Sequence, residues 1–164
     1  MAEPLPPGVT ADAMAETLKR FRQIVGQEWV FTGERVISYH DPYPVSNDDT
    51  RYRAHAAVAP ASVEQVQDIV KAANAWGVPL WPVSRGKNFA YGGAAPVLSG
   101  SVVLDLSRMN RVLEVNEKFG YALVEPGVSY FDLYNYIQAH GLKLWLDVPD
   151  PGWGSVMGNA LDHG

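Results

Sequence analysis

The feature that most restricts the fold is a strand–helix–strand pattern between residues 56 and 83. Residues 56–59 and 79–83 are short apolar runs of the length expected for buried strands. Between them, Ser62 and Gln65 have the spacing of a capping box, in which each side chain satisfies an exposed amide of the first helical turn. The apolar residues that follow with helical spacing are Val63, Val66, Ile69, Val70 and Ala73, and Gly77 ends the helix. This unit predicts α/β structure with parallel strands.

The flanking segments predict further helices and strands. Thr10 is placed to cap a helix over 11–24, and Ser129 to open one that continues to about Ala139. Strands are expected at 29–31, 102–104, 112–115 and 121–124, a loop at 38–53 and a short helix at 155–161. The chain is therefore predicted to be α+β, with one subdomain over 56–106 and a second over 107–164.

Composition excludes several kinds of site. The 164 residues include no cysteine, which rules out a disulfide framework, a zinc site made of thiolates and a cysteine nucleophile. The four histidines are scattered without ligand-like spacing, so no metal is expected. A net charge of −5 argues against a nucleic-acid partner. No signal peptide and no apolar run of roughly 18 residues is present, so we expect a cytoplasmic protein without membrane contact.

Residues 82–93 form the strongest local motif. They follow a predicted strand and contain three glycines together with four donors, Ser84, Arg85, Lys87 and Asn88. Glycines let the backbone approach an anion closely, and successive amides form an anion-binding concavity. The two cations would offset a diphosphate charge of about −2. The alternative is an ordinary glycine-rich turn at the surface, and the spacing matches neither a P-loop nor a Rossmann fingerprint.

Two weaker motifs lie further along the chain. Gly152, Gly154 and Gly158 resemble a dinucleotide fingerprint that is one residue too long, and they suit a close backbone approach to a flat ligand. Residues 125–128, Glu-Pro-Gly-Val, end a strand and lead into a helix. Taken alone, this segment is explained by a Pro-Gly turn before a helix cap.

Taken together and in order, these segments resemble a known family. Residues 82–96, 124–128 and 145–164 resemble the vanillyl-alcohol oxidase and para-cresol methylhydroxylase flavoproteins, with their FAD-binding domain of the para-cresol methylhydroxylase type. Residues 40–44, 98–104 and 109–116 support the resemblance, which runs over nearly the whole chain. Members of the family are much longer. We therefore expect this chain to be the amino-terminal portion of an FAD-binding domain, ending before the substrate-cap domain.

The resemblance implies a role for each motif. The first loop would wrap the FAD pyrophosphate through Pro82, Val83, Ser84, Arg85, Gly86, Lys87 and Asn88. Glu125, Pro126 and Gly127 would pack along the cofactor, and Gly154, Ser155, Gly158 and Asn159 would line the isoalloxazine side. Apart from the family, Trp145 and Trp153 are explained simply as side chains that pack beneath the flavin loop.

Two catalytic residues are implied in the same way. Tyr91 matches the tyrosine that helps to hold the substrate as a phenolate, and Asp150 matches the acidic residue beside the reactive flavin nitrogen. Without the family, Tyr91 is explained as a packing aromatic and Asp150 as a turn cap between two prolines. A phenol titrates near pH 10, so donors are needed to keep it ionised at neutral pH.

The implied activity is oxidation of para-substituted phenols, such as vanillyl alcohol, eugenol or a 4-alkylphenol, by hydride transfer from the benzylic carbon to flavin. Residues 147–150 resemble the oxidase branch, which makes molecular oxygen the expected acceptor. The alternatives are a 4-cresol-type dehydrogenase that passes electrons to cytochrome c, and an inactive FAD-binding fragment. We expect homo-oligomers at full length and no turnover from these 164 residues alone.

Overall fold

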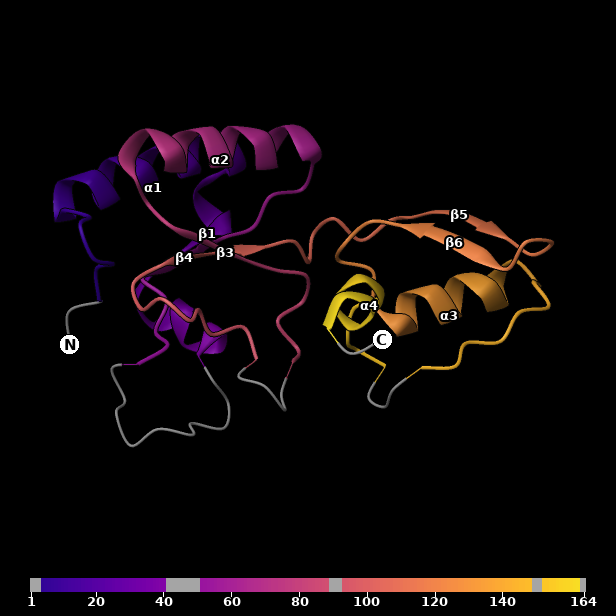
Figure 1. The fold of residues 1–164 in the computed structure, drawn as a ribbon. Coiled ribbons are helices and arrows are strands. Elements are labelled where there is room, and N and C mark those ends of the chain that lie inside the picture. The colour runs from indigo at the N-terminus through magenta and orange to yellow at the C-terminus, as the bar shows by residue number, and fades with distance from the viewer. Residues whose placement is uncertain (1–3, 41–50, 89–92, 149–151, 163–164) are drawn as a thin grey trace.

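The computed structural model describes residues 4–40, 51–88, 93–148 and 152–162. They form two lobes that lie side by side (Figure 1). The first lobe, up to residue 106, contains a four-stranded sheet, and the second, from residue 107, contains a two-stranded sheet with a helix beneath it. The predicted mixture of helix and strand is therefore present.

The sheet of the first lobe contains the predicted strand–helix–strand unit. Its strands are β1 (Val30–Phe31), β2 (Ala56–Val58), β3 (Leu80–Val83) and β4 (Val102–Asp105), in the order β1-β2-β4-β3. β4 pairs in parallel with both β2 and β3, and β1 pairs antiparallel with β2. The chain thus crosses from β2 to β3 over a position that β4 later fills. The carboxyl ends of three parallel strands consequently share one edge.

Two helices cover one face of this sheet, α1 (Ala11–Val25) and α2 (Val63–Trp76) (Figure 1). Thr10 caps α1 by accepting from the amide of Ala13, as predicted. The predicted apolar face of α2 was wrong at two positions, because Val63 is 56% exposed and Val70 39%. The buried stripe of α2 is instead Ile69, Ala72 and Ala73. Small side chains in this stripe let α1 approach α2 closely.

The opposite face of the sheet is covered by a segment that the sequence did not predict. Two 3-10 helices, η1 (Gln27–Trp29) and η2 (Gly33–Tyr39), flank β1. A second core lies against η2 and consists of the buried residues Val36, Ala54, Ala57 and Val103. The predicted loop at 38–53 begins two residues inside η2, and its residues 41–50 lie outside the described residues.

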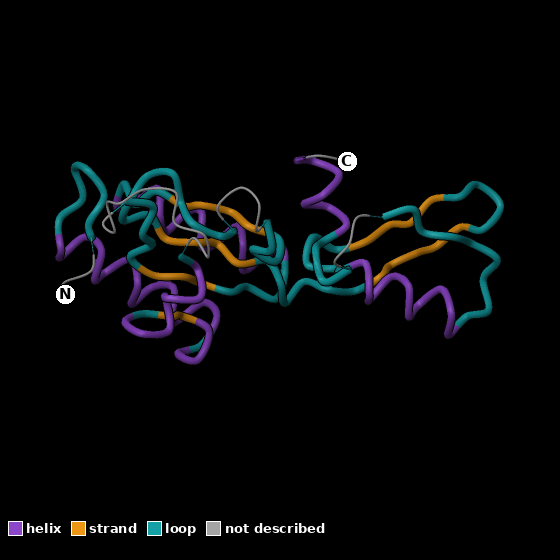
Figure 2. The backbone as a smooth tube through the Cα atoms, turned by 90° about the horizontal axis from the view of Figure 1, so that it is seen from below, coloured by secondary structure: helices purple, strands orange, loops and turns teal. Residues whose placement is uncertain are grey.

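The second lobe holds β5 (Val112–Asn116), β6 (Tyr121–Val124), α3 (Tyr130–Ala139) and α4 (Val156–Asp162). β5 and β6 form the predicted hairpin over α3, around a third core of Val128, Leu133 and Ile137. Of the two tryptophans expected to pack beneath the flavin loop, Trp145 is 90% exposed and Trp153 46% exposed. Both views place α4 at the junction of the lobes (Figures 1 and 2).

Across the part of the chain that the structure describes, every helix falls short of the length and apolarity needed to cross a membrane.

Candidate functional site

The first segment of the candidate site leaves the carboxyl edge of the large sheet. β3 ends at Val83, which pairs with Asp105 at the end of β4, and residues 84–88 continue outward from there. Gly86 turns this segment with a left-handed φ of 63°. A Cβ at Gly86 would lie 2.7 Å from the Cβ of Ala94. The glycine is therefore required both by the turn and by the close approach.

The second segment, 152–159, is held by the start of α3. The amides of Tyr130 and Phe131 donate to the carbonyl oxygens of Gly154 and Gly152, at 3.1 and 2.9 Å. The amide of Val156 donates to the carbonyl of Val128 at 3.0 Å. The exposed amides at a helix start need acceptors, and here backbone carbonyls supply them. This end of α3 is consequently occupied by the protein's own chain.

Ser155 then begins α4. Its hydroxyl accepts from the amide of Gly158 at 2.9 Å, and its carbonyl accepts from the amide of Asn159 at 3.1 Å. The residue is buried and forms an isolated antiparallel bridge with Ser129. Ser155 thus has a structural role as a helix cap, in addition to the predicted role beside the cofactor.

The two predicted cofactor segments meet at Ser84 and Gly158. A Cβ added at Gly158 would lie 3.6 Å from the Ser84 hydroxyl oxygen and 3.8 Å from its Cβ. Ser84 belongs to the first lobe and Gly158 to the second. The fold therefore brings together the glycine-rich loop and the start of α4, as a single site for one elongated ligand requires.

The third predicted segment has a clear structural function. The Arg111 guanidinium donates to the Glu125 carboxylate at 2.7 and 3.0 Å, and the Arg111 amide donates to it at 2.8 Å. These hydrogen bonds hold the pKa of Glu125 below its usual value. Gly127 donates to the carbonyl of Met109, and a Cβ at Gly127 would collide with the carbonyl oxygens of Leu106, Ser107 and Met109. Glu125 and Gly127 thus fix the segment before α3 to residues 106–111, which lead from β4 into the second lobe.

The remaining predicted residues are placed as follows. Pro82 and Val83 lie in β3, where they pair with Leu104 and Asp105. Lys87 and Asn88 are exposed, and the Asn88 carbonyl accepts from the amide of Gly93 at 2.7 Å. Pro126 is partly buried. Tyr91 and Asp150 lie outside the described residues, so their catalytic roles stay predictions.

Two contacts near the site were not predicted. The Arg85 guanidinium donates to the Gly127 carbonyl at 2.9 Å and lies 3.5 Å from the Asp132 carboxylate. The Tyr39 hydroxyl donates to the Asp105 carboxylate at 2.7 Å. The signal that was available is the position of Asp105, a carboxylate at the end of a buried strand. The sequence holds no local indication of either partner.

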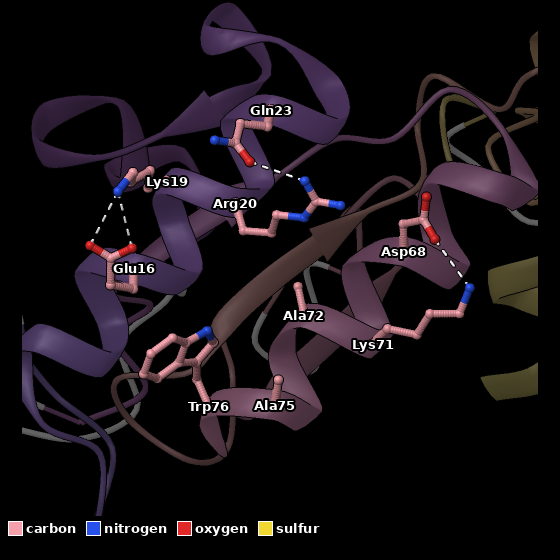
Figure 3. A pocket seen from close by; sticks show the side chains of 9 residues that line it. All are labelled: Glu16, Lys19, Arg20, Gln23, Asp68, Lys71, Ala72, Ala75 and Trp76. Carbon is pink, nitrogen blue, oxygen red and sulfur yellow. Dashed lines mark hydrogen bonds and ion pairs between the residues drawn. The ribbon is translucent and has the colours of Figure 1, made fainter.

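A separate hollow lies between α1 and α2 (Figure 3). It contains none of the predicted site residues, and its charged side chains pair along their own helices, as Glu16 does with Lys19 and Asp68 with Lys71. Exposed pairs of this kind contribute little energy and serve mainly as a solvated surface. We do not assign the cofactor to this hollow.

Comparison with known proteins shows the family of this domain. A model described as an FAD binding domain matches residues 54–164. The chain belongs to this family of FAD-binding domains. FAD is accordingly the cofactor of the domain, as predicted.

Individual relatives refine the assignment. The chain is 38% identical to the 4-cresol dehydrogenase [hydroxylating] flavoprotein subunit of Pseudomonas putida, over 98% of this chain and 31% of that protein. Among solved structures, it is 46% identical to 4-ethylphenol oxidase from Gulosibacter chungangensis, with a TM-score of 0.94 over 98% of this chain and 31% of that one. It is 38% identical to p-cresol methylhydroxylase, with a TM-score of 0.91 over 98% of this chain and 31% of that one.

These relatives confirm the predicted para-cresol methylhydroxylase type of FAD-binding fold. The chain spans about 31% of the length of the relatives it matches. The described residues also fit the cofactor. Gly86 and Gly158 keep side chains out of the two segments that meet at Ser84, and the 84–88 backbone lies at the carboxyl edge of a parallel sheet, where ligands of such sheets bind. The segments 84–88 and 154–159 therefore stay the predicted site of FAD, which we call the proposed FAD cradle.

Proposed function

We propose that this chain is the FAD-holding part of a flavin-dependent oxidoreductase that oxidises para-substituted phenols. The observation that carries the proposal is the meeting of Ser84 and Gly158, which unites two glycine-rich segments from different lobes. The relatives with the same fold are named for 4-cresol and 4-ethylphenol, two para-substituted phenols.

The residues of the chain divide the work. The amides of 84–88, with Lys87, would bind the pyrophosphate of FAD, and residues 154–159 would lie along its ring system. When bound, FAD supplies the hydride acceptor for oxidation at the benzylic carbon. Tyr91 would hold the phenol as a phenolate, which releases electrons toward that carbon. Asp150 would take up a proton or adjust the charge beside the ring.

A titration of the 164-residue chain with FAD tests the cofactor part of the proposal. Binding is expected to quench flavin fluorescence and to leave a yellow protein after gel filtration. The matched variant is Gly158→Ala, which places a methyl group between the two segments. A protein that stays colourless with excess FAD would contradict the proposal and favour the alternative of an inactive remnant.

The phenol part is tested by a chimera. Replacing the matching segment of the Gulosibacter oxidase with this chain is expected to give an enzyme that oxidises 4-ethylphenol, with the parent oxidase as the control. Tyr91→Phe in the chimera should lower kcat/KM by about 10²-fold, because the phenolate loses a hydrogen-bond donor in the reacting state. An unchanged kcat/KM would remove Tyr91 from the mechanism.

We propose oxygen as the electron acceptor, on the basis of residues 147–150. The runner-up is transfer to a cytochrome c subunit, in keeping with the name of the Pseudomonas relative. Oxygen uptake by the chimera, compared with reduction of an artificial dye, separates the two. Fast dye reduction without oxygen uptake would favour the dehydrogenase.

A further inference from the structure

Arg85 stands within the glycine-rich loop, yet its guanidinium contacts the other lobe. Its Nη1 donates to the carbonyl oxygen of Gly127 at 2.9 Å and lies 3.5 Å from Oδ2 of Asp132. The side chain is 27% exposed, and its Nε is buried without a hydrogen-bond partner among the described residues. A cation serving as a diphosphate ligand would place its donors toward the ligand. Arg85 instead uses one of them on a peptide carbonyl at the base of α3.

The two partners of Arg85 are themselves fixed. The carboxylate of Asp132 accepts from the amide and hydroxyl of Ser129, at 2.9 and 2.6 Å, and so completes the capping box of α3. Gly127 is held against the chain that leaves β4. Arg85 therefore joins the loop to two rigid points at the start of α3, and the Asp132 carboxylate offsets part of its charge.

These contacts close a ring around the proposed cofactor segments. The loop 84–88 reaches Gly127 through Arg85. Residues 128–131, which follow Gly127, hold the segment 152–156 by backbone hydrogen bonds. That segment leads into α4, where Gly158 returns to Ser84. Arg85 makes its link in this ring by a hydrogen bond from its side chain.

We propose that Arg85 is a positioning residue for FAD rather than a ligand of its diphosphate. It sets the separation of the loop 84–88 from the segment 154–159 by tying the loop to Gly127 and Asp132. The inference rests on the proposed function, since it concerns the same cradle. It replaces the expectation that Arg85 neutralises the diphosphate.

The two roles predict different responses to substitution. For a positioning role, Arg85→Met raises the Kd for FAD about tenfold, as expected for a hydrogen bond to a charged group. Arg85→Lys raises it nearly as much, because one ammonium group cannot reproduce the planar fork of the guanidinium. Asp132→Asn also raises the Kd. In the double variant with Arg85→Met, the Kd for FAD rises by no more than the product of the two single increases. Lys71→Met, which removes an exposed charge on α2, is the control and leaves the Kd unchanged.

A diphosphate ligand would respond in the opposite way. Arg85→Lys would then bind FAD like the wild type, Asp132→Asn would tighten binding by releasing the guanidinium, and Arg85→Met would reduce the dependence of the Kd on salt. Any of these results overturns the proposal. Thermal unfolding of each variant shows whether it is folded.

A measurement without FAD separates this inference from the proposed function. In the FAD-free chain, Arg85→Met should speed amide hydrogen exchange in both 84–88 and 127–132, whereas Lys71→Met should not. Unchanged exchange in these segments would contradict the positioning role even if FAD binds. Failure of the wild type to bind FAD would remove the proposed function but leave the exchange test to decide the contact.

Discussion

The hydroxyl of Tyr39 donates a hydrogen bond of 2.7 Å to the carboxylate of Asp105. Asp105 ends β4, pairs with Val83 and also accepts from the amide of Ser107 at 2.8 Å. Tyr39 ends η2, on the face of the sheet opposite to α1 and α2. The contact therefore ties η2 to the sheet edge from which the proposed FAD cradle starts. Burial, and then the Asp105 charge, raise the pKa of the Tyr39 phenol above its usual range.

Tyr39→Phe should lower the free energy of unfolding by about 1–2 kcal/mol at pH 7, because the charged acceptor loses its donor. Since the folded pKa is raised, this contribution is complete below about pH 10.0, the ordinary value, and declines as the pH rises further. Urea unfolding at pH 7 and pH 10.5 measures it. The difference between wild type and variant should be smaller at pH 10.5, and a difference that grows there would contradict the assignment.

Gly127→Ala should destabilise the chain by about 1–3 kcal/mol, since the added methyl meets three backbone carbonyls that cannot move as a side chain would. Gly141→Ala is a suitable comparison. Gly141 has a left-handed φ of 63° and open space around it, so that variant meets only the backbone penalty of about 1 kcal/mol. Denaturant unfolding of the pair distinguishes collision from conformational cost. Equal losses of stability in the two variants would show that the carbonyls of residues 106–109 can move to make room for the methyl group.

Gly158→Ala should weaken FAD binding more than it weakens the fold. Alanine favours a helix over glycine by up to about 1 kcal/mol, which offsets part of the collision with the Ser155 hydroxyl 2.5 Å away. The methyl group also narrows the junction with Ser84, so we expect the Kd for FAD to rise about tenfold, or about 1.4 kcal/mol. Gly120→Ala, at the β5–β6 turn, should do the reverse. It lowers stability through its φ of 63° and leaves the Kd alone.

Glu125→Gln should lower the free energy of unfolding by about 1–2 kcal/mol at pH 7, because the Arg111 guanidinium loses a charged acceptor. The lowered pKa of Glu125 fixes the sign of the pH dependence. Its stabilisation is present above the ordinary value of 4.5 and is lost as the pH falls through the folded pKa. Denaturant unfolding at pH 7 and pH 3 measures this. The free energies of unfolding of wild type and variant should differ at pH 7 and become equal at pH 3. A difference between wild type and variant that is the same at both pH values would show that the ionised Glu125 carboxylate does not cause it.

Local signals made much of the fold predictable. Thr10, Ser62 and Ser129 each cap the helix that they were predicted to open, because capping depends on residues three positions apart. Contacts between distant segments have no such signal. Arg85 was expected to face a diphosphate, and its pairing with Gly127 depends on how the second lobe sits. Val63 and Val70 are likewise exposed, because the face of α2 that packs in the core is the one with Ile69, Ala72 and Ala73, and periodicity alone did not identify it.

For the candidate site too, the local motifs could be predicted from the sequence and the contacts between them could not. The glycine-rich segments could be found from composition and order, and their meeting at Ser84 and Gly158 required the fold. Glu125 and Gly127 were predicted to pack along the cofactor, which stays a prediction. What the structure shows of them is their attachment to Arg111 and to residues 106–109.

The hydrogen bonds from Tyr130 and Phe131 to Gly154 and Gly152 have a consequence for folding. The first turn of α3 and the strand-like segment before α4 satisfy each other's polar groups, so neither is complete without the other. They should open and close as one cooperative unit. The segment that we propose to lie along the isoalloxazine is then held in place only when the chain has returned to the base of α3.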